Sequence, residues 1–185
     1  ESADAMFEYV MAINQWALKP DIIRHICDES GPTIDWLIDL GVKFPPEYLV
    51  CSGVDIVARG HPSEGAGHGI AERLINAAGA LEVQTALGTR VERLLVEAGR
   101  VVGVHAGGMD LRAPATIVST GGFGNNPELV KKHFPSAAQH GSWTWAVHDG
   151  LPFILGDGLK MGEAIGAGIV GHDGGLPLPS SGFGR

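Results

Sequence analysis

Three glycine-containing segments of this 185-residue sequence are the places where a ligand could meet the backbone: residues 65–69, 119–126 and 156–161. Glycine has no side chain to keep a ligand away. The first N–H groups of a helix are unpaired and carry a partial positive charge, which attracts phosphate. We therefore examine each segment as a candidate site for a phosphate-bearing or flat ligand.

The first segment, residues 65–69, reads Gly-Ala-Gly-His-Gly and precedes an expected helix. Its spacing is not G-x-G-x-x-G, and no clear strand comes before it. A phosphate-binding helix N-terminus needs that kind of context. Phosphate binding and a plain flexible start to the helix therefore both stay open.

The second segment, residues 119–126, directly follows an expected strand at Thr116–Val118. The adjacent Gly121 and Gly122 would let a flat ligand lie against bare backbone. The alternative is a tight strand–helix turn, in which the two asparagines that end the segment cap the helix that Pro127 opens.

In the third segment, Asp157 stands between Gly156 and Gly158 at an expected helix start. An aspartate there is a common N-cap. Its carboxylate could instead accept a hydrogen bond from a ribose hydroxyl or meet the edge of a ring. Both interpretations stay open on the residues alone.

The amino-acid composition argues against some classes of binding partner. The chain has 13 basic and 21 acidic residues, a formal net charge of -8, and no Lys/Arg cluster, which argues against nucleic acid and anionic membranes. No apolar run approaches the roughly 18 residues that a membrane helix needs. Nothing at Glu1 resembles a signal peptide. We expect no membrane insertion, a cytoplasmic location and two reduced, buried thiols, Cys27 and Cys51.

No residue is assigned to catalysis and no metal site is expected. Four scattered histidines have neither a nucleophile partner nor metal-ligand spacing. We expect them at the surface or in loops: His133, His140, His148 and His172. Trp143 and Trp145 flank an expected loop, where ordinary packing and an aromatic lid are the two interpretations.

Apolar spacing predicts a helical cluster over residues 3–40, interrupted by Pro20 and by Gly31-Pro32 and capped by Gly41. Residues 41–66 are typical of irregular structure, because proline and glycine punctuate them. A helix that Gly79 ends follows.

The next stretch predicts a β-meander. Its expected strands lie near residues 91–96, 101–104 and 117–118, with turns at 98–100 and 107–110. Helices are expected to return at Pro127–His133 and at Leu159–Ile165. The predicted fold class is α/β.

The order and spacing of several motifs resemble one known family. They are Thr89–Leu95, Gly99–Val104, Ala115–Gly124 and Gly156–Gly158. Together they are similar to the FAD-binding domain of the fumarate reductase and succinate dehydrogenase flavoprotein superfamily, to which 3-ketosteroid dehydrogenases also belong.

This resemblance covers residues 1–170 and implies a partial, Rossmann-like FAD-binding domain with a β-meander and an N-terminal helical cluster. It implies a helical subdomain at 1–60, the core of the FAD-binding domain at 61–170, and the start of a connection to a cap domain at 171–185.

The resemblance also implies roles for five residues. The backbone of Val91 would meet the adenine of FAD. Thr120, Gly121 and Gly122 would lie at the dinucleotide, and the Asp157 carboxylate would contact the cofactor. FAD is the implied cofactor, with a small molecule as substrate.

Two departures from the family stand out. Its strand, G-x-G-x-x-G turn and helix, which bind the pyrophosphate, have no counterpart here. The His-Pro-Thr of fumarate reductases aligns with Leu178-Pro179-Ser180, which argues against fumarate reduction itself. We therefore expect the chain to be an internal part of its parent, inactive alone and weak or lacking in FAD binding.

The parent would transfer a hydride between FAD and a small organic acid or a ketosteroid-like enone. The alternative is a non-catalytic scaffold that acts, if at all, by self-association. An apolar strand at 115–118 left at a sheet edge would favour a homo-oligomer.

Overall fold

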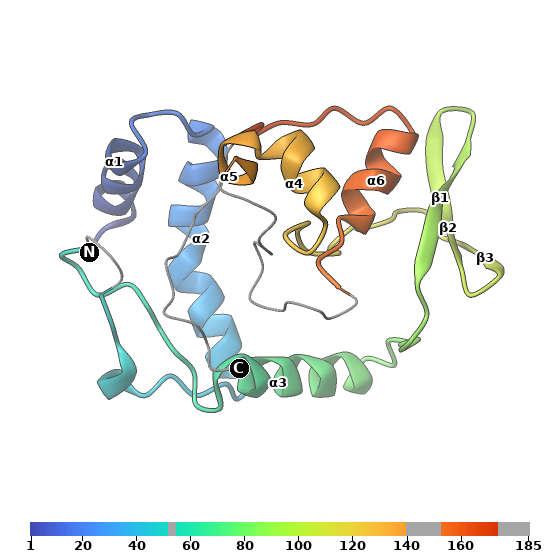
Figure 1. Ribbon diagram of the computed structural model, residues 1–185. Coiled ribbons are helices and arrows are strands. Elements are labelled where there is room, and N and C mark those ends of the chain that lie inside the picture. Colours follow the sequence, from blue (N-terminus) through green and yellow to red (C-terminus); the bar gives the residue numbers. More distant parts are fainter. Residues whose placement is uncertain (52–54, 140–152, 174–185) are drawn as a thin grey trace, which may run out of the picture. The chain divides into compact units, whose positions relative to one another are not determined.

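The computed structural model describes residues 1–51, 55–139 and 153–173 (Figure 1). They fall into two compact units, Glu1–Thr85 and Ala86–Arg185. The first unit is helical, and the second combines a three-stranded antiparallel sheet with short helices. The predicted mixture of helix and sheet is confirmed. Several residues discussed above lie outside the described part: His140, Trp143, Trp145, His148 and Leu178-Pro179-Ser180.

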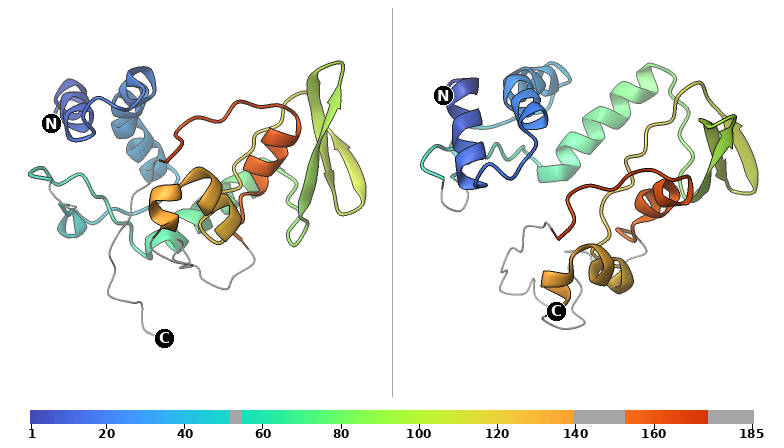
Figure 2. Two further views of the ribbon diagram at one scale, coloured as in Figure 1. Left: turned by 45° about the horizontal axis from the view of Figure 1, so that its top comes forward. Right: turned by 90° about the horizontal axis from the view of Figure 1, so that it is seen from above.

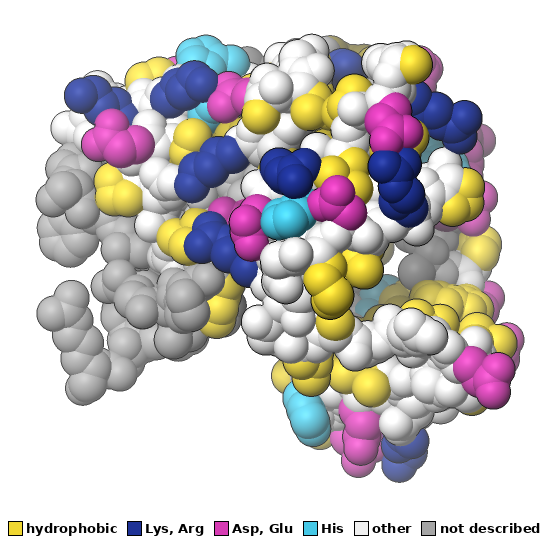
Figure 3. All heavy atoms as spheres, turned by 90° about the vertical axis from the view of Figure 1, so that its right-hand side faces the viewer, with side chains coloured by type: hydrophobic (Ala, Val, Ile, Leu, Met, Phe, Trp, Pro, Cys, Tyr) yellow, Lys and Arg dark blue, Asp and Glu magenta, His cyan; other side chains and the backbone are white. Residues whose placement is uncertain are grey.

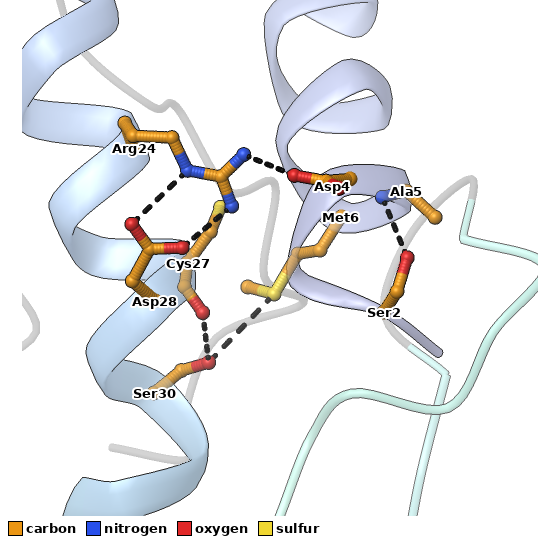
Figure 4. A network of polar contacts seen from close by, with 8 residues as sticks. All are labelled: Ser2, Asp4, Ala5, Met6, Arg24, Cys27, Asp28 and Ser30. Carbon is orange, nitrogen blue, oxygen red and sulfur yellow. Dashed lines mark hydrogen bonds and ion pairs between the residues drawn. The ribbon is translucent and has the colours of Figure 1, made fainter.

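Two helices, α1 (Ala3–Ile13) and α2 (Pro20–Asp39), pack against each other in the first unit. Met11 on α1 is fully buried and Cys27 on α2 is 4% exposed. The predicted burial of Cys27 is confirmed, and that of Cys51 is wrong, because Cys51 is exposed. Arg24 of α2 bridges the pair, because its guanidinium contacts Asp4 of α1 at 2.8 Å (Figure 4). This ion pair links α1 to α2.

The predicted break at Gly31-Pro32 is wrong, because α2 continues through it as one helix of 20 residues. Proline in a helix removes one backbone hydrogen bond. The turn before Pro32 is held in place, because Cys27 is buried and the Ser30 hydroxyl donates to the Cys27 carbonyl at 3.1 Å. Pro20 is the first residue of α2, where no N–H is needed.

The predicted cap at Gly41 is confirmed. Gly41 is left-handed (φ +88°), its N–H bonds to the Ile38 carbonyl, and the next N–H, of Val42, bonds to the Leu37 carbonyl. This pair of bonds is the Schellman arrangement, which satisfies the last carbonyls of a helix. Val42 is 4% exposed, so the cap also returns the chain to the core.

A short 3₁₀ turn, η1 (Pro46–Tyr48), and an isolated bridge between Val50 and Gly60 interrupt the expected irregular stretch. Helix α3 (Ala66–Ala80) follows. It begins one residue after Gly65, so residues 67–69 lie inside its first turn rather than before it. Gly79 likewise lies within the helix and does not end it.

Arg59 holds this irregular stretch to α1. Its guanidinium pairs with Glu1 and lies 4.2 Å from the centroid of the Tyr9 ring. The Tyr9 hydroxyl donates to Asp55 at 2.5 Å, and this hydrogen bond raises the pKa of Tyr9. A cation on an aromatic face, flanked by carboxylates, is a typical anchor for a loop without regular structure.

The second unit contains the β-meander: β1 (Val91–Glu97), β2 (Arg100–Ala106) and β3 (Met109–Arg112), in the order β1-β2-β3. The first two strands are confirmed. The third was predicted at 117–118, but residues 116–118 form no strand. Gly107 and Gly108 are both left-handed and make a two-residue hairpin turn, so the chain returns immediately into β3.

Both signs of charge cover the exposed side of the meander (Figure 3). Asp110 on β3 accepts from His105 on β2 at 2.6 Å and pairs with Arg93 on β1 at 3.6 Å. The hydrogen bond from His105 is the main cause that holds the pKa of Asp110 below its ordinary value. Such cross-strand pairs and an edge strand that carries charges discourage further strand pairing at β3.

The described part of the second unit also contains three short helices: α4 (Pro127–His133), α5 (Pro135–Ala138) and α6 (Asp157–Ala164). The predicted positions of α4 and α6 are confirmed. Figure 2 shows α6 beside β1, and Met161 is buried there at 6% exposure. Lys132 of α4 donates to Glu163 of α6 at 2.5 Å. Within the described residues, none of the helices combines the length and apolarity that crossing a membrane requires.

The Lys132–Glu163 contact predicts a pH dependence. The hydrogen bond from Lys132 holds the pKa of Glu163 below its ordinary value. A lowered carboxyl pKa stabilises the fold above the unfolded pKa of about 4.3, and this contribution is lost as the pH falls through the folded value. We expect the thermal midpoint of wild type to exceed that of Glu163→Gln slightly at neutral pH, because the pair is partly exposed.

The difference between the two proteins should shrink toward zero below about pH 4. Thermal unfolding of both proteins across the acidic range measures it. A difference that stays constant down to acid pH would show that this carboxylate does not contribute through its charge.

The crowding around Gly103 predicts that a side chain at this position would destabilise the sheet. This β2 residue has φ +148°, and a Cβ on it would lie 2.1 Å from the Leu111 carbonyl oxygen of β3. Gly103→Ala should therefore separate β2 from β3 and cost about 2 kcal/mol or more. The matched control is Gly108→Ala, at φ +76° with nothing within 4 Å, which bears only the left-handed strain of about 1–2 kcal/mol. Denaturant unfolding compares them, and equal midpoints would contradict the argument.

Candidate functional site

Two of the glycine segments predicted separately form one structure in the second unit. The N–H of Gly158 donates to Thr120 Oγ1 at 2.9 Å, and the N–H of Gly156 donates to the Gly122 carbonyl at 3.0 Å. The segment after residue 118 therefore lies directly against the start of α6.

Close approach explains the glycines at 156 and 158. A Cβ on Gly156, which has φ +75°, would lie 2.3 Å from Leu129 Cδ1. A Cβ on Gly158 would lie 2.4 Å from Thr120 Oγ1 and 2.7 Å from Val118 Cγ1. A side chain at Gly158 would push Thr120 and Val118 away from α6, and one at Gly156 would displace Leu129 of α4.

Gly121 has a different environment. It is left-handed at φ +73°, and a Cβ on it would meet nothing within 4 Å. A Cβ on the neighbouring Gly122 would only touch Ile154, at 3.7 Å. Internal packing within the described residues thus does not require Gly121 to be small, and Gly121 is exposed.

The asparagines that end the second segment turn the chain as expected. Asn126 is the N-cap of α4, and its Oδ1 accepts from the Leu129 N–H at 3.2 Å. Its Nδ2 donates to the Leu155 carbonyl at 3.1 Å, and the Asn125 N–H donates to the Ile154 carbonyl at 3.0 Å. The predicted cap is confirmed, and the same side chain fixes the approach to α6.

Asp157 is the first residue of α6, and the N-cap is Gly156. The interpretation of Asp157 as an N-cap is therefore wrong. Its carboxylate instead accepts two hydrogen bonds from Arg90, from Nε at 3.1 Å and from an Nη at 2.7 Å. This pairing raises the pKa of Arg90. The Asp157 side chain is 29% exposed, so a ligand can still reach it.

A pocket of about 640 Å³ lies between the start of β1 and α6. Val91 and Asp157 both line it. Its other charged side chains are Arg90, Glu92, Arg93 and Lys160, and Met161 is among its apolar residues. The fold thus joins a β1 residue to an α6 residue 66 positions later.

Two of the five predicted site residues line the pocket, and Thr120, Gly121 and Gly122 do not. Val91 and Asp157 share the pocket, and the start of α6 is bonded to Thr120 and Gly122, with Gly121 between them. Arg90 is the residue that sequence reasoning missed. Its partner lies 67 residues away, and the one available signal was its place directly before Val91.

The expected exposure of His133 is wrong. It is 8% exposed, because the last turn of α4 faces α6 and places its Nε2 3.6 Å from Glu163. Its ring packs against Phe123 and His172, with centroids 5.9 and 6.4 Å away. His172 is exposed in a loop, as expected.

The sequence contains the pattern G-x-G-x-x-G once, at residues 166–171. This stretch follows α6, and residues 167–171 belong to no helix or strand. A pyrophosphate-binding turn needs a strand before it and a helix after it, so this spelling carries no such role.

The crowding at Gly158 can be tested. Gly158→Ala should displace Thr120 and lower stability by about 1–3 kcal/mol, as overpacking does. Gly162→Ala is the control on the same helix, because its Cβ would lie an ordinary 3.5 Å from Ala167 and alanine favours helix. Denaturant unfolding should show a lower midpoint for the first variant only. An unchanged midpoint would mean that the two segments are not held in contact.

Two curated proteins illustrate what the chain is similar to in sequence. The chain is 27% identical over 177 residues to a cytochrome-type fumarate reductase of Shewanella frigidimarina, covering 91% of this chain and 30% of that protein. It is 33% identical over 105 residues to a KsdD-like steroid dehydrogenase of Mycolicibacterium smegmatis, covering 45% and 19%.

A solved structure of the open conformation of a flavocytochrome c3 fumarate reductase superposes with a TM-score of 0.77 at 25% identity, covering 91% of this chain and 30% of that one. The chain thus spans less than a third of the length of each of these relatives. A family model described as FAD binding domain matches residues 1–174. The chain therefore belongs to the FAD-binding domain family of flavin-dependent oxidoreductases.

Proposed function

We propose that this chain is a Rossmann-like part of a FAD-dependent oxidoreductase and holds the adenosine half of FAD in the pocket between β1 and α6. One observation carries the proposal: Val91 and Asp157, to which the family resemblance assigns cofactor contacts, line the same pocket. A pocket that combines an apolar wall with a few polar groups is typical of a cofactor site.

Each residue has a distinct part in this proposal. The Val91 backbone meets the adenine, and the Asp157 carboxylate accepts hydrogen bonds from hydroxyl groups of the cofactor. Gly121 lets the dinucleotide approach the backbone, since no described side chain would meet even a Cβ there. Thr120 holds the start of α6 in place through its bond to Gly158.

Bound FAD would supply the hydride chemistry, and the protein would supply placement and electrostatics. A small organic acid or a ketosteroid-like enone is the proposed substrate class, in keeping with relatives named fumarate reductase and steroid dehydrogenase. Leu178 stands where fumarate reductases have a histidine, so we propose a substrate other than fumarate. The division at residues 60 and 170, the weak FAD binding of the chain alone and a homo-oligomeric state stay predictions.

The cofactor role of Asp157 can be tested in the complete gene product that contains this chain. Asp157→Asn keeps the shape but removes the charge, so a charge-assisted hydrogen bond is lost. We expect FAD affinity to fall on the order of tenfold or more. The control, His172→Ala, changes an exposed loop residue outside the pocket and should leave the affinity unchanged.

Flavin content after dialysis and titration of the apoprotein with FAD measure the effect. Equal FAD retention in the two variants would refute the assignment of Asp157. A colourless complete protein that takes up no FAD would instead favour a scaffold without catalysis.

A further inference from the structure

Arg90 stands out among the side chains of the pocket because it forms hydrogen bonds to Asp157, which the proposed function assigns to cofactor binding. Its Nε and an Nη donate to the two different oxygens of Asp157, at 3.1 and 2.7 Å. Two parallel bonds of this kind fix the plane of a carboxylate, whereas a single bond lets it rotate. Arg90 itself is 64% exposed, so it is held mainly by this pairing.

The pairing leaves Asp157 able to bind something else. A carboxylate offers about four acceptor positions, and the two bonds from Arg90 occupy one on each oxygen. The remaining positions belong to a side chain that is 29% exposed and lines the pocket next to Val91. Two neighbouring hydroxyl groups, as on a ribose, match two free acceptor positions on one fixed carboxylate.

The charge of Arg90 matters as well. An unpaired carboxylate would repel the diphosphate of an approaching dinucleotide, and Arg90 neutralises it. Arg93 and Lys160 add two further cations to the wall of the pocket, and Glu92 adds one carboxylate. The local balance therefore suits an anionic ligand, although the chain as a whole carries a net charge of -8.

We infer that Arg90 is a positioning residue, which orients the Asp157 carboxylate toward the ribose hydroxyls of the adenosine half of a bound dinucleotide. The inference rests on the proposed function and goes beyond it, because it names the ligand group and a residue that acts through another. This positioning role requires two donors on one planar guanidinium group, and the ammonium group of lysine cannot replace them.

The test compares two probes on the apoprotein of the complete gene product: ADP, and 2′,3′-dideoxy-ADP, which lacks both ribose hydroxyls. Sites built to bond a hydroxyl discriminate strongly against the analogue without it. We expect wild type to prefer ADP by about tenfold or more. Arg90→Gln should reduce this preference to near unity, and Arg90→Lys should restore little of it.

The matched control is Arg112→Gln. Arg112 is 60% exposed and paired with Glu97 on the meander, and it does not line the pocket. The variant removes the same charge from the same unit and should keep the wild-type preference. The ratio of two affinities is the readout, because a general loss of folded protein lowers both affinities and leaves their ratio unchanged.

The outcomes separate the two proposals. If Asp157→Asn abolishes the preference and Arg90→Gln keeps it, the role of Arg90 is refuted while the site stands. If Asp157→Asn changes neither FAD affinity nor the preference, the site itself is refuted, and the role of Arg90 with it. Loss of the preference in Arg112→Gln as well would show a long-range charge effect and would also overturn the inference.

Discussion

The contact between the start of α6 and the segment ending in Gly122 is the constraint on which the second unit depends. Two backbone N–H groups of the α6 start bond across it, to Thr120 and to the Gly122 carbonyl. Such contact needs an absence of side chains, which Gly156 and Gly158 provide. The position of Asp157 follows directly, because it lies between these two glycines. Its carboxylate then reaches Arg90 and the wall of the pocket beside β1.

Glycine has two different roles in this site. At Gly156 and Gly158 the missing Cβ is replaced by protein, since Leu129 and Thr120 fill the space. At Gly121 no described atom fills it. Glycines of the first kind maintain the architecture, and glycines of the second kind leave backbone available to a ligand. Because the composition counts 28 glycines without distinguishing them, only their neighbours reveal which kind each one is.

The first unit is held together by side-chain interactions rather than by backbone contact. Its helices α1 and α2 pack against each other, Met11 and Cys27 are buried, and the guanidinium of Arg24 on α2 contacts Asp4 on α1. Arg59 does the same for a segment with little regular structure. Charged side chains thus link segments of this helical unit in addition to its apolar packing, whereas backbone contact holds the site in the second unit.

Local signals in the sequence determined a good part of this protein. Helical apolar spacing predicted α1, α4 and α6, the valine-rich runs predicted β1 and β2, and the Asn-Pro pair predicted the cap of α4. Motif order indicated the family that the comparison confirmed. Tertiary structure decided the rest. Pro32 stays inside α2, β3 begins directly after Gly108, and His133 is buried against α6. Arg90 meets Asp157 across 67 residues, because packing, and not sequence spacing, determines which distant side chains come together.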